Sequence, residues 1–208
     1  MVSMIADASA AILAGGTGTR LGGAAKAFLE IEGRSILARQ LEVLRPLFAE
    51  VLIIANDPVP YSELGLRVVP DRFPGRGAPG GVHAALEAVS SFGWVFCVAC
   101  DMPFLQASPI ALLAAHRGQG VDAVMPIRRG YYEPLFAFYA RTLAAPFGKA
   151  LSVGAPSLVR LLDAASTVRV SEEEYTRADP GGRSLENVNT PEDLARASPR
   201  APRDQPRR

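Results

Sequence analysis

A glycine-rich stretch directly behind the first apolar run constrains this chain most. Residues 11–26 read AILAGGTGTRLGGAAK, so a predicted strand ends in Gly15 and Gly16 and passes into a loop of small residues that carries Arg20 and ends at Lys26. Successive backbone N–H groups in such a turn form a concave set of donors, and residues without a Cβ let phosphate oxygens approach closely. The pattern predicts a polyphosphate-binding loop at the end of a strand.

Two common phosphate loops do not fit the spacing. A dinucleotide fingerprint that starts at Gly16 needs a glycine where the chain has Leu21, and an ATP P-loop needs glycine before its lysine and Ser or Thr after it, whereas both neighbours of Lys26 are alanines. We therefore expect an open loop in which Arg20 and Lys26 neutralise the pyrophosphate that leaves a nucleoside triphosphate. A tight strand-to-helix turn with solvated cations is the alternative that the residues leave open.

The periodicity of the chain predicts an α/β fold with a mostly parallel sheet. Short apolar runs alternate with amphipathic segments, as expected of βα units that form a Rossmann-like three-layer sandwich. Helices are predicted over residues 35–47 and from Gly81 onward, the second directly after a Pro-Gly-Gly turn. The predicted strands are residues 10–13, 51–55, 67–69, 95–100, 123–127, 135–139 and 167–170. In such a sheet, function is expected at the strand ends.

Composition limits the size of the fold and the class of partner. The 208 residues carry a net charge of +1 and are 49% hydrophobic, which suits one domain with a real core, assigned here to residues 1–197. Residues 198–208 (SPRAPRDQPRR) hold four arginines against one aspartate, and we expect a disordered basic tail; contact of this tail with RNA or membrane is the alternative. Without a clustered cationic surface we expect no nucleic-acid partner, and without a signal peptide or membrane span, a cytoplasmic protein.

The two cysteines form a C-x-x-C spacing that can serve redox or zinc chemistry. Cys97 and Cys100 lie in WVFCVACD, a run of β-forming residues, and positions three apart on a strand point to opposite faces. We therefore predict two buried, unpaired thiols and no metal site there.

Asp101 follows the same apolar run and so lies at the carboxyl end of a predicted strand. A carboxylate at this rim can hold Mg²⁺, which usually takes one or two protein carboxylates and obtains its other ligands from phosphate and water. A turn aspartate bonded to nearby backbone is the alternative, since Met102-Pro103 follows.

Taken in order, these motifs resemble the molybdenum cofactor guanylyltransferase (MobA) family within the nucleotidyltransferase superfamily. The resemblance covers residues 10–197 and rests on LAGGTGTRLGGAAK, NDP, VVPD, GAPGGVHAAL, CDMPFL, EPLFAFY and NVNTPEDL. It implies a fold of the nucleotide-diphospho-sugar transferase type. It also implies transfer of GMP from GTP to the terminal phosphate of molybdopterin carrying molybdenum, with release of pyrophosphate and Mg²⁺ as cofactor.

Site residues follow from the resemblance position by position. It implies that Arg20, Lys26 and Asp101 are catalytic and that Asp101 holds the metal, while Asp71 could accept from N1–H and the exocyclic amine of guanine. Asn187 and Asn189 match asparagines on the molybdopterin side, although one of them could complete the metal shell. The implied GTP-binding residues are Leu13, Ala14, Gly15, Gly16, Lys26, Asn56, Asp71 and Asp101. Partner proteins that insert molybdenum or accept the cofactor are implied as well, and we prefer a monomer.

Three departures from the family pattern bear on this interpretation. Ala25 stands where the family has an aspartate, Ala78-Pro79 alters the G-P-L-x-G loop, and Glu133 replaces Gln or His before Pro-Leu. The alternatives are a related cytidylyltransferase, a sugar-phosphate nucleotidyltransferase, or a catalytically weak protein that binds GTP and pterin.

Overall fold

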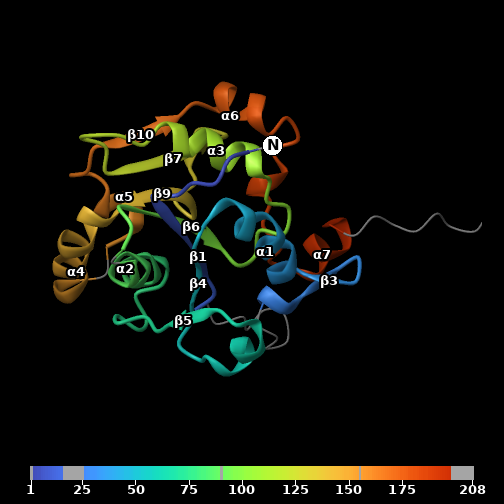
Figure 1. Ribbon diagram of the computed structural model, residues 1–208. Coiled ribbons are helices and arrows are strands. Elements are labelled where there is room, and N and C mark those ends of the chain that lie inside the picture. Colours follow the sequence, from blue (N-terminus) through green and yellow to red (C-terminus); the bar gives the residue numbers. More distant parts are fainter. Residues whose placement is uncertain (1, 16–25, 90, 155, 198–208) are drawn as a thin grey trace, which may run out of the picture.

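A mixed, mostly parallel sheet forms the centre of the molecule. The computed structural model describes residues 2–15, 26–89, 91–154 and 156–197, and its strands run in the order β10-β7-β9-β6-β1-β4-β5, with β8 paired to β7 (Figure 1). The main strands are β1 (Ala8–Leu13), β4 (Val51–Ile54), β5 (Arg67–Val69), β6 (Trp94–Ala99), β7 (Ala123–Arg128), β8 (Tyr131–Tyr132), β9 (Phe136–Ala140) and β10 (Thr167–Val170). The predicted α/β class and the predicted strands are confirmed.

The register of the central strands brings three chain segments to one edge of the sheet. Strand β1 pairs in parallel with both β4 and β6, and Leu13 is opposite Ile54 on one side and Ala99 on the other. The residues that follow these strands therefore emerge side by side. Strand β9 is antiparallel to both β6 and β7, an interruption that its apolar sequence FAFYA does not signal.

Helices cover both faces of this sheet, as the three-layer prediction requires. Alternate residues of β1 enter opposite cores: Ala10 and Ile12 pack with α1 and α3, while Ala11 packs with α2 and α4. The helices are α1 (Ile36–Leu47), α2 (Ala78–Ala88), α3 (Ala107–Ala115), α4 (Ala144–Val153), α5 (Leu158–Leu161), α6 (Glu172–Ala178) and α7 (Pro191–Ala197).

Helix boundaries follow the local capping chemistry. Helix α1 begins after Ser35, whose hydroxyl accepts from the N–H of Ala38, so the predicted start is confirmed. The predicted start of α2 at Gly81 is wrong by three residues. The helix begins at Ala78, because Pro79 fits the first turn, where its missing N–H costs nothing, and Gly77 before it takes a positive φ of 63°.

Short elements complete the chain. They are the β2–β3 hairpin (Glu30–Ile31 and Arg34–Ser35) and the 3-10 turns η2 (Lys26–Phe28), η3 (Val59–Leu64), η4 (Arg141–Leu143) and η5 (Arg183–Leu185). The hairpin and α7 lie side by side (Figure 1), and they share a small core of Ile31, Ile36 and Val188 against which Leu194 packs.

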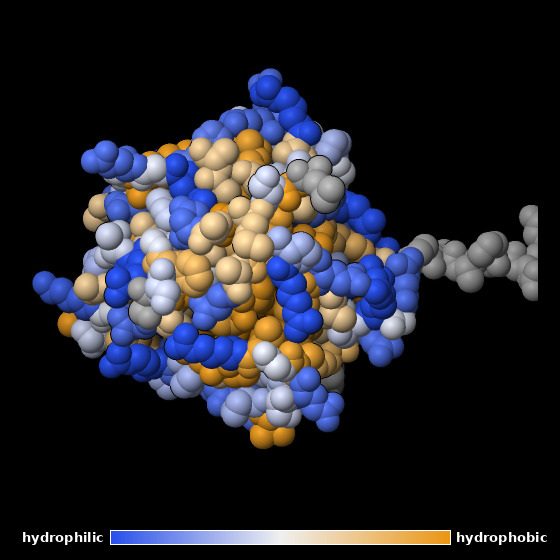
Figure 2. Space-filling view, viewed as in Figure 1, coloured by the Kyte–Doolittle hydropathy of each residue, from blue (hydrophilic) through white to orange (hydrophobic). Residues whose placement is uncertain are grey.

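No helix among residues 2–15, 26–89, 91–154 and 156–197 is long and apolar enough to cross a membrane. Figure 2 shows hydrophilic residues around the rim of one face and hydrophobic residues gathered in its middle. The predicted tail, residues 198–208, lies outside the described part of the chain.

Candidate active site

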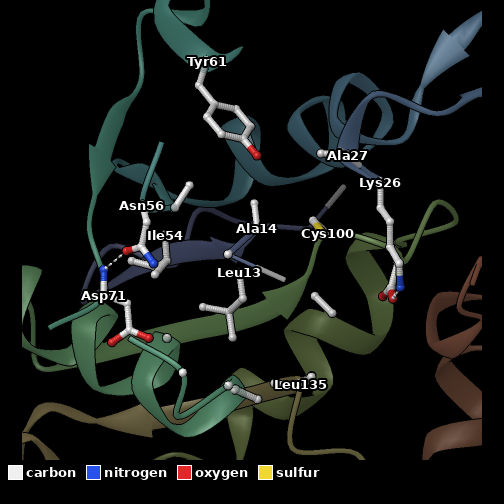
Figure 3. A pocket seen from close by; sticks show the side chains of 18 residues that line it. Leu13, Ala14, Lys26, Ala27, Ile54, Asn56, Tyr61, Asp71, Cys100 and Leu135 are labelled. Carbon is white, nitrogen blue, oxygen red and sulfur yellow. Dashed lines mark hydrogen bonds and ion pairs between the residues drawn. The ribbon is translucent and has the colours of Figure 1, made fainter. Parts of the chain in front are cut away.

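A cavity of about 520 Å³ opens where β1, β4 and β6 end, at the edge predicted for function (Figure 3). Asn56 and Asp71 lie at one end of it and Lys26 at the other, with Leu13 and Ala14 between them. The cavity is thus polar at both ends and apolar in its middle, which suits an elongated ligand with a different polar group at each end.

Lys26, Asp101 and Asn189 meet at one end of the cavity. The Lys26 Nζ lies 3.3 Å from Asp101 Oδ2 and donates to Asn189 Oδ1 at 2.5 Å. The side chains of Lys26 and Asp101 are 25% and 16% exposed, so this ion pair is partly shielded from water and stronger than a surface pair. The structure brings together three residues that the sequence places 75 and 163 positions apart.

The loop that carries Asp101 is held from two sides. Gln40 on α1 is fully buried, and its Nε2 donates to the carbonyls of Ala99 at 2.7 Å and Met102 at 3.0 Å, which bracket Asp101. Val188 N–H donates to the Asp101 carbonyl at 2.8 Å. The sequence analysis missed Gln40; the signal available was a polar residue within the apolar face of the 35–47 helix.

Asn56 and Asp71 form the other end of the cavity. The Asn56 side-chain carbonyl accepts from the Asp71 N–H at 2.8 Å, and Asp71 Oδ1 accepts from the Phe73 N–H at 2.7 Å (Figure 3). A Cβ built on Gly80 would lie 2.4 Å from Asp71 Oδ2, so the carboxylate occupies the space that a side chain at position 80 would fill. Asp71 therefore rests on the first turn of α2, where the positive end of a helix favours a carboxylate.

Tyr61 on η3 adds a polar group that the sequence analysis missed. The side chain is 3% exposed and points its hydroxyl toward Ala14 and Cys100 in the cavity, where it has no hydrogen-bond partner among the described residues (Figure 3). Burial raises the pKa of Tyr61 to about 12, so the hydroxyl keeps its proton and can donate. A single tyrosine in a 3-10 turn carries no sequence signal for this role.

The cysteines follow the prediction in part. Cys97 and Cys100 are unpaired and belong to opposite cores of the sheet. Burial of both was predicted, but Cys100 is only partly buried, because it stands one residue past β6 and lines the cavity. Burial raises the pKa of Cys100 to about 12, so it remains a thiol.

Comparison with known proteins agrees with this geometry. A family model described as a MobA-like NTP transferase domain matches residues 10–170. The chain belongs to the MobA-like NTP transferase family. The molybdenum cofactor guanylyltransferase of Syntrophotalea carbinolica is 34% identical over 187 residues, which is 89% of this chain and 88% of that protein.

Solved structures place the chain in the same group. It is similar to molybdopterin-guanine dinucleotide biosynthesis protein A from Archaeoglobus fulgidus, with a TM-score of 0.79 and 29% identity over 91% of this chain and 96% of that one. The 2-C-methyl-D-erythritol 4-phosphate cytidylyltransferase from Thermus thermophilus shares the fold, with a TM-score of 0.61 and 22% identity over 90% and 95%. The fold is thus of the nucleotide-diphospho-sugar transferase type, as predicted.

A MobA-like transferase is expected to need a divalent metal ion, and the residues around Asp101 fit one. Asp101 Oδ1 is buried and has no partner among the described residues, while Oδ2 and the Asn189 amide oxygen both face the Lys26 ammonium. Oxygen donors of this kind suit Mg²⁺. No group of three or more His, Cys, Asp or Glu side chains that could hold a metal is found in the described part of the chain. Asp101 is the carboxylate that lines the Lys26 end of the cavity.

Two backbone groups at the end of β1 already form hydrogen bonds within the protein. The Leu13 carbonyl accepts from Cys100 N–H at 3.2 Å, and Ala14 N–H donates to the Ile54 carbonyl at 2.9 Å. No backbone hydrogen bond from Gly15 is found among the described residues. Gly15 lines the same cavity as Leu13 and Ala14. Gly16, Arg20 and Ala25 lie outside the described residues.

Asn187 lies in a second cavity, of about 730 Å³, and does not join the Lys26 cluster. Arg128, Arg129, Tyr131 and Glu133 also line this cavity. Burial raises the pKa of Glu133, while Arg128 nearby opposes the shift. Asn187 thus lines the second cavity, while Asn189, two residues further on, contacts Lys26, which lines the first.

Proposed function

We propose that this MobA-like transferase moves GMP from GTP to the terminal phosphate of molybdopterin carrying molybdenum, which forms the guanine dinucleotide cofactor and releases pyrophosphate. The observation that carries the proposal is the meeting of Lys26, Asp101 and Asn189 at one end of a cavity whose other end holds Asp71. The names of the relatives supply the identity of donor and acceptor.

The two ends of the cavity define how GTP lies in it. The base is assigned to the Asp71 end, where Oδ1 accepts from the Phe73 N–H and the carboxylate lines the cavity, so that it can accept from the N–H groups of guanine. The phosphates are assigned to the Lys26 end, and the Gly15 N–H and the glycine loop that follows would supply further donors. The Asn56 amide nitrogen faces the cavity at the Asp71 end, and the Tyr61 hydroxyl faces it between the two ends.

The chemistry asks little of the protein beyond placement and charge. An oxygen of the acceptor phosphate attacks the α-phosphorus of GTP, the new P–O bond forms, and the bond to the bridging oxygen of the β-phosphate breaks. Because the acceptor is already an anion, no general base is needed, and positioning with charge neutralisation dominates. Lys26, together with Arg20, stabilises the charge that develops on the departing pyrophosphate.

Asp101 is proposed to hold Mg²⁺, with Asn189 as the second protein ligand within reach. When bound, the ion withdraws charge from the phosphate oxygens of GTP and so favours attack at phosphorus. The Lys26 ammonium, 3.3 Å from Asp101 Oδ2, supplies a second positive charge beside this position.

The acceptor is assigned to the second cavity. Asn187 lines it two residues from Asn189, so an acceptor bound there would have its phosphate near the Lys26 end of the first cavity. Arg128 and Arg129 supply positive charge for an anionic acceptor. We also propose that residues 1–197 act as one domain and as a monomer in the cytoplasm, and that proteins which insert molybdenum or receive the cofactor contact it transiently.

The test is pyrophosphate release with molybdopterin, Mg²⁺ and each of GTP, CTP and ATP in turn. We expect release with GTP alone and expect Asp101→Asn to lose at least about a hundredfold in kcat, since it removes the charge that faces the metal and Lys26. Asp163→Asn, an exposed carboxylate before β10, is the matched control and should behave as the wild type. Release with CTP alone would assign the chain to the cytidylyltransferases, and GTP binding without release would indicate a carrier.

A further inference from the structure

The segment that carries Asn189 is fixed to the loop of Asp101 on one side. Val188 is 2% exposed, packs with Ile31 and Ile36, and donates its N–H to the Asp101 carbonyl at 2.8 Å. This contact fixes one end of the segment. It does not by itself fix the Asn189 side chain, which lies one residue further on.

The start of α7 fixes the other end through an extended helix cap. Asp193 N–H donates to Thr190 Oγ1 at 3.1 Å, and Asp193 Oδ2 accepts from the Thr190 N–H at 3.0 Å. These two bonds are the reciprocal capping pattern common at helix starts. The same carboxylate oxygen also accepts from the N–H of Asn189, again at 3.0 Å, which a helix cap alone does not require.

We propose that Asp193 is a positioning residue, which holds the Asn189 amide against the Lys26 ammonium and thereby sets where Lys26 stands in the active site. This proposal rests on the proposed function in one respect: the proposed function assigns Lys26 to the phosphates of GTP.

Lys26 needs such support because of its own chemistry. A lysine side chain has four flexible carbons and loses about 2 kcal/mol of rotamer entropy when it is fixed, so its ammonium stays in place only where partners hold it. Among the described residues its partners are Asp101 and Asn189.

The obvious competing role is that Asp193 only stabilises α7, and the chain offers a matched control for it. Helix α6 has seven residues, as α7 does, and Ser171 caps it by accepting from the Glu174 N–H at 3.2 Å. Ser171→Ala removes a helix cap away from the site. Asp193→Asn provides rescue, since its amide oxygen can still accept from the N–H groups of Asn189 and Thr190.

One readout does not depend on catalysis at all. The chain has two lysines, Lys26 and Lys149, and Lys149 is exposed on α4. Brief acetylation with acetic anhydride at fixed pH, followed by peptide mass spectrometry, gives the labelling rate of Lys26 relative to Lys149. This ratio reports how well the Lys26 ammonium is shielded and paired.

We expect Asp193→Ala to raise the labelling ratio at least threefold and to lower kcat by about tenfold to a hundredfold, with the KM for GTP changed far less, as when a supporting contact of a catalytic group is lost. Asp193→Asn should restore most of both values. Ser171→Ala should lower the melting temperature by as much as Asp193→Ala while leaving the ratio and kcat unchanged. Arg196→Ala, which removes only the partner of the other carboxylate oxygen, should leave the ratio unchanged.

The proposal is overturned if Asp193→Ala has the labelling ratio of the wild type while its melting temperature falls as in Ser171→Ala, because Asp193 would then serve the helix alone. Failure of the proposed function looks different: the wild type would then fail to release pyrophosphate with GTP. In that case the labelling ratio still decides whether Asp193 places Lys26.

Discussion

Adding one methyl group at Gly80 should displace Asp71 and so test what this carboxylate does. A Cβ at position 80 would lie 2.4 Å from Asp71 Oδ2, 2.8 Å from Oδ1 and 2.9 Å from Cγ. Non-bonded carbon atoms prefer separations of about 3.5–4.0 Å, so the carboxylate must move by about 1 Å. At the neighbouring Gly81, the nearest atoms would be Leu13 Cδ2 at 3.6 Å and Ile54 Cγ2 at 3.9 Å, which is ordinary contact.

The magnitudes follow from the bonds involved. In Gly80→Ala the carboxylate leaves the Phe73 N–H at 2.7 Å, and a hydrogen bond to a charged group is worth about 1.5–3 kcal/mol. The alanine regains up to about 1 kcal/mol of helix propensity, so the net loss in the free energy of unfolding is about 0.5–2 kcal/mol. For a chain of this size that corresponds to a melting temperature lower by about 1–8 °C. Gly81→Ala keeps the propensity gain alone and should melt higher by up to about 4 °C.

The assay is GTP transfer and GTP binding, with ATP and CTP for comparison. If Asp71 reads guanine, Gly80→Ala should raise the KM for GTP by about tenfold or more, the equivalent of losing a charged hydrogen bond, and should leave ATP and CTP as poor as before. Gly81→Ala should retain the selectivity of the wild type. Unchanged selectivity in Gly80→Ala would refute base reading by Asp71. An effect of Gly80→Ala that persists in an Asp71→Ala background would refute the clash itself.

Three further predictions concern buried polar groups. Gln40→Leu removes the amide that donates to the two carbonyls on either side of Asp101, and kcat should fall by about tenfold or more while the KM for GTP changes little; an unchanged kcat would show that the Asp101 loop keeps its position without Gln40. Burial lowers the pKa of His83, which packs edge-on against Phe73. Below about pH 6.5 the unfolded chain therefore binds a proton at His83 more readily than the folded chain does, and the free energy of unfolding should fall as the pH decreases through this range. His83→Leu should reduce this dependence of the free energy of unfolding on pH. Tyr61→Phe removes only a hydroxyl and should weaken GTP binding by about two- to tenfold with no change in melting temperature. A lower melting temperature with unchanged GTP binding would instead assign the hydroxyl a structural role.

The strands could be predicted from the sequence because their signals are local. Residues 51–55 and 95–100 are apolar on both sides, as strands covered by helices on two faces must be, and the structure has β4 and β6 there. The same argument placed Asp101 at a strand end. It could not give the direction of β9, since direction depends on the neighbouring strands and not on the run FAFYA itself.

Site contacts were predictable only where the family motif supplied them. Lys26, Asp101 and Asn189 were each predicted as site residues, yet nothing in their spacing shows that the Lys26 ammonium contacts both of the other two. Gln40 was missed for a related reason: its role depends on the carbonyls of a loop 59 and 62 residues away, which become its partners only when α1 packs beside the end of β6.

The residues at the two ends of the cavity are therefore held by contacts that differ in sequence separation. This difference predicts which end loses its geometry first when the fold loosens. At the base end, Asp71 bonds to Phe73 two residues away and to Asn56 fifteen residues away, all within one strand-to-helix connection and its neighbour. At the phosphate end, Lys26 depends on partners 75 and 163 residues away. Local contacts survive partial loosening of a fold better than contacts that need distant elements in register. Perturbations that loosen α7 should thus lower kcat before they alter the choice of base, and a variant that loses selectivity first would mean that the two ends are coupled.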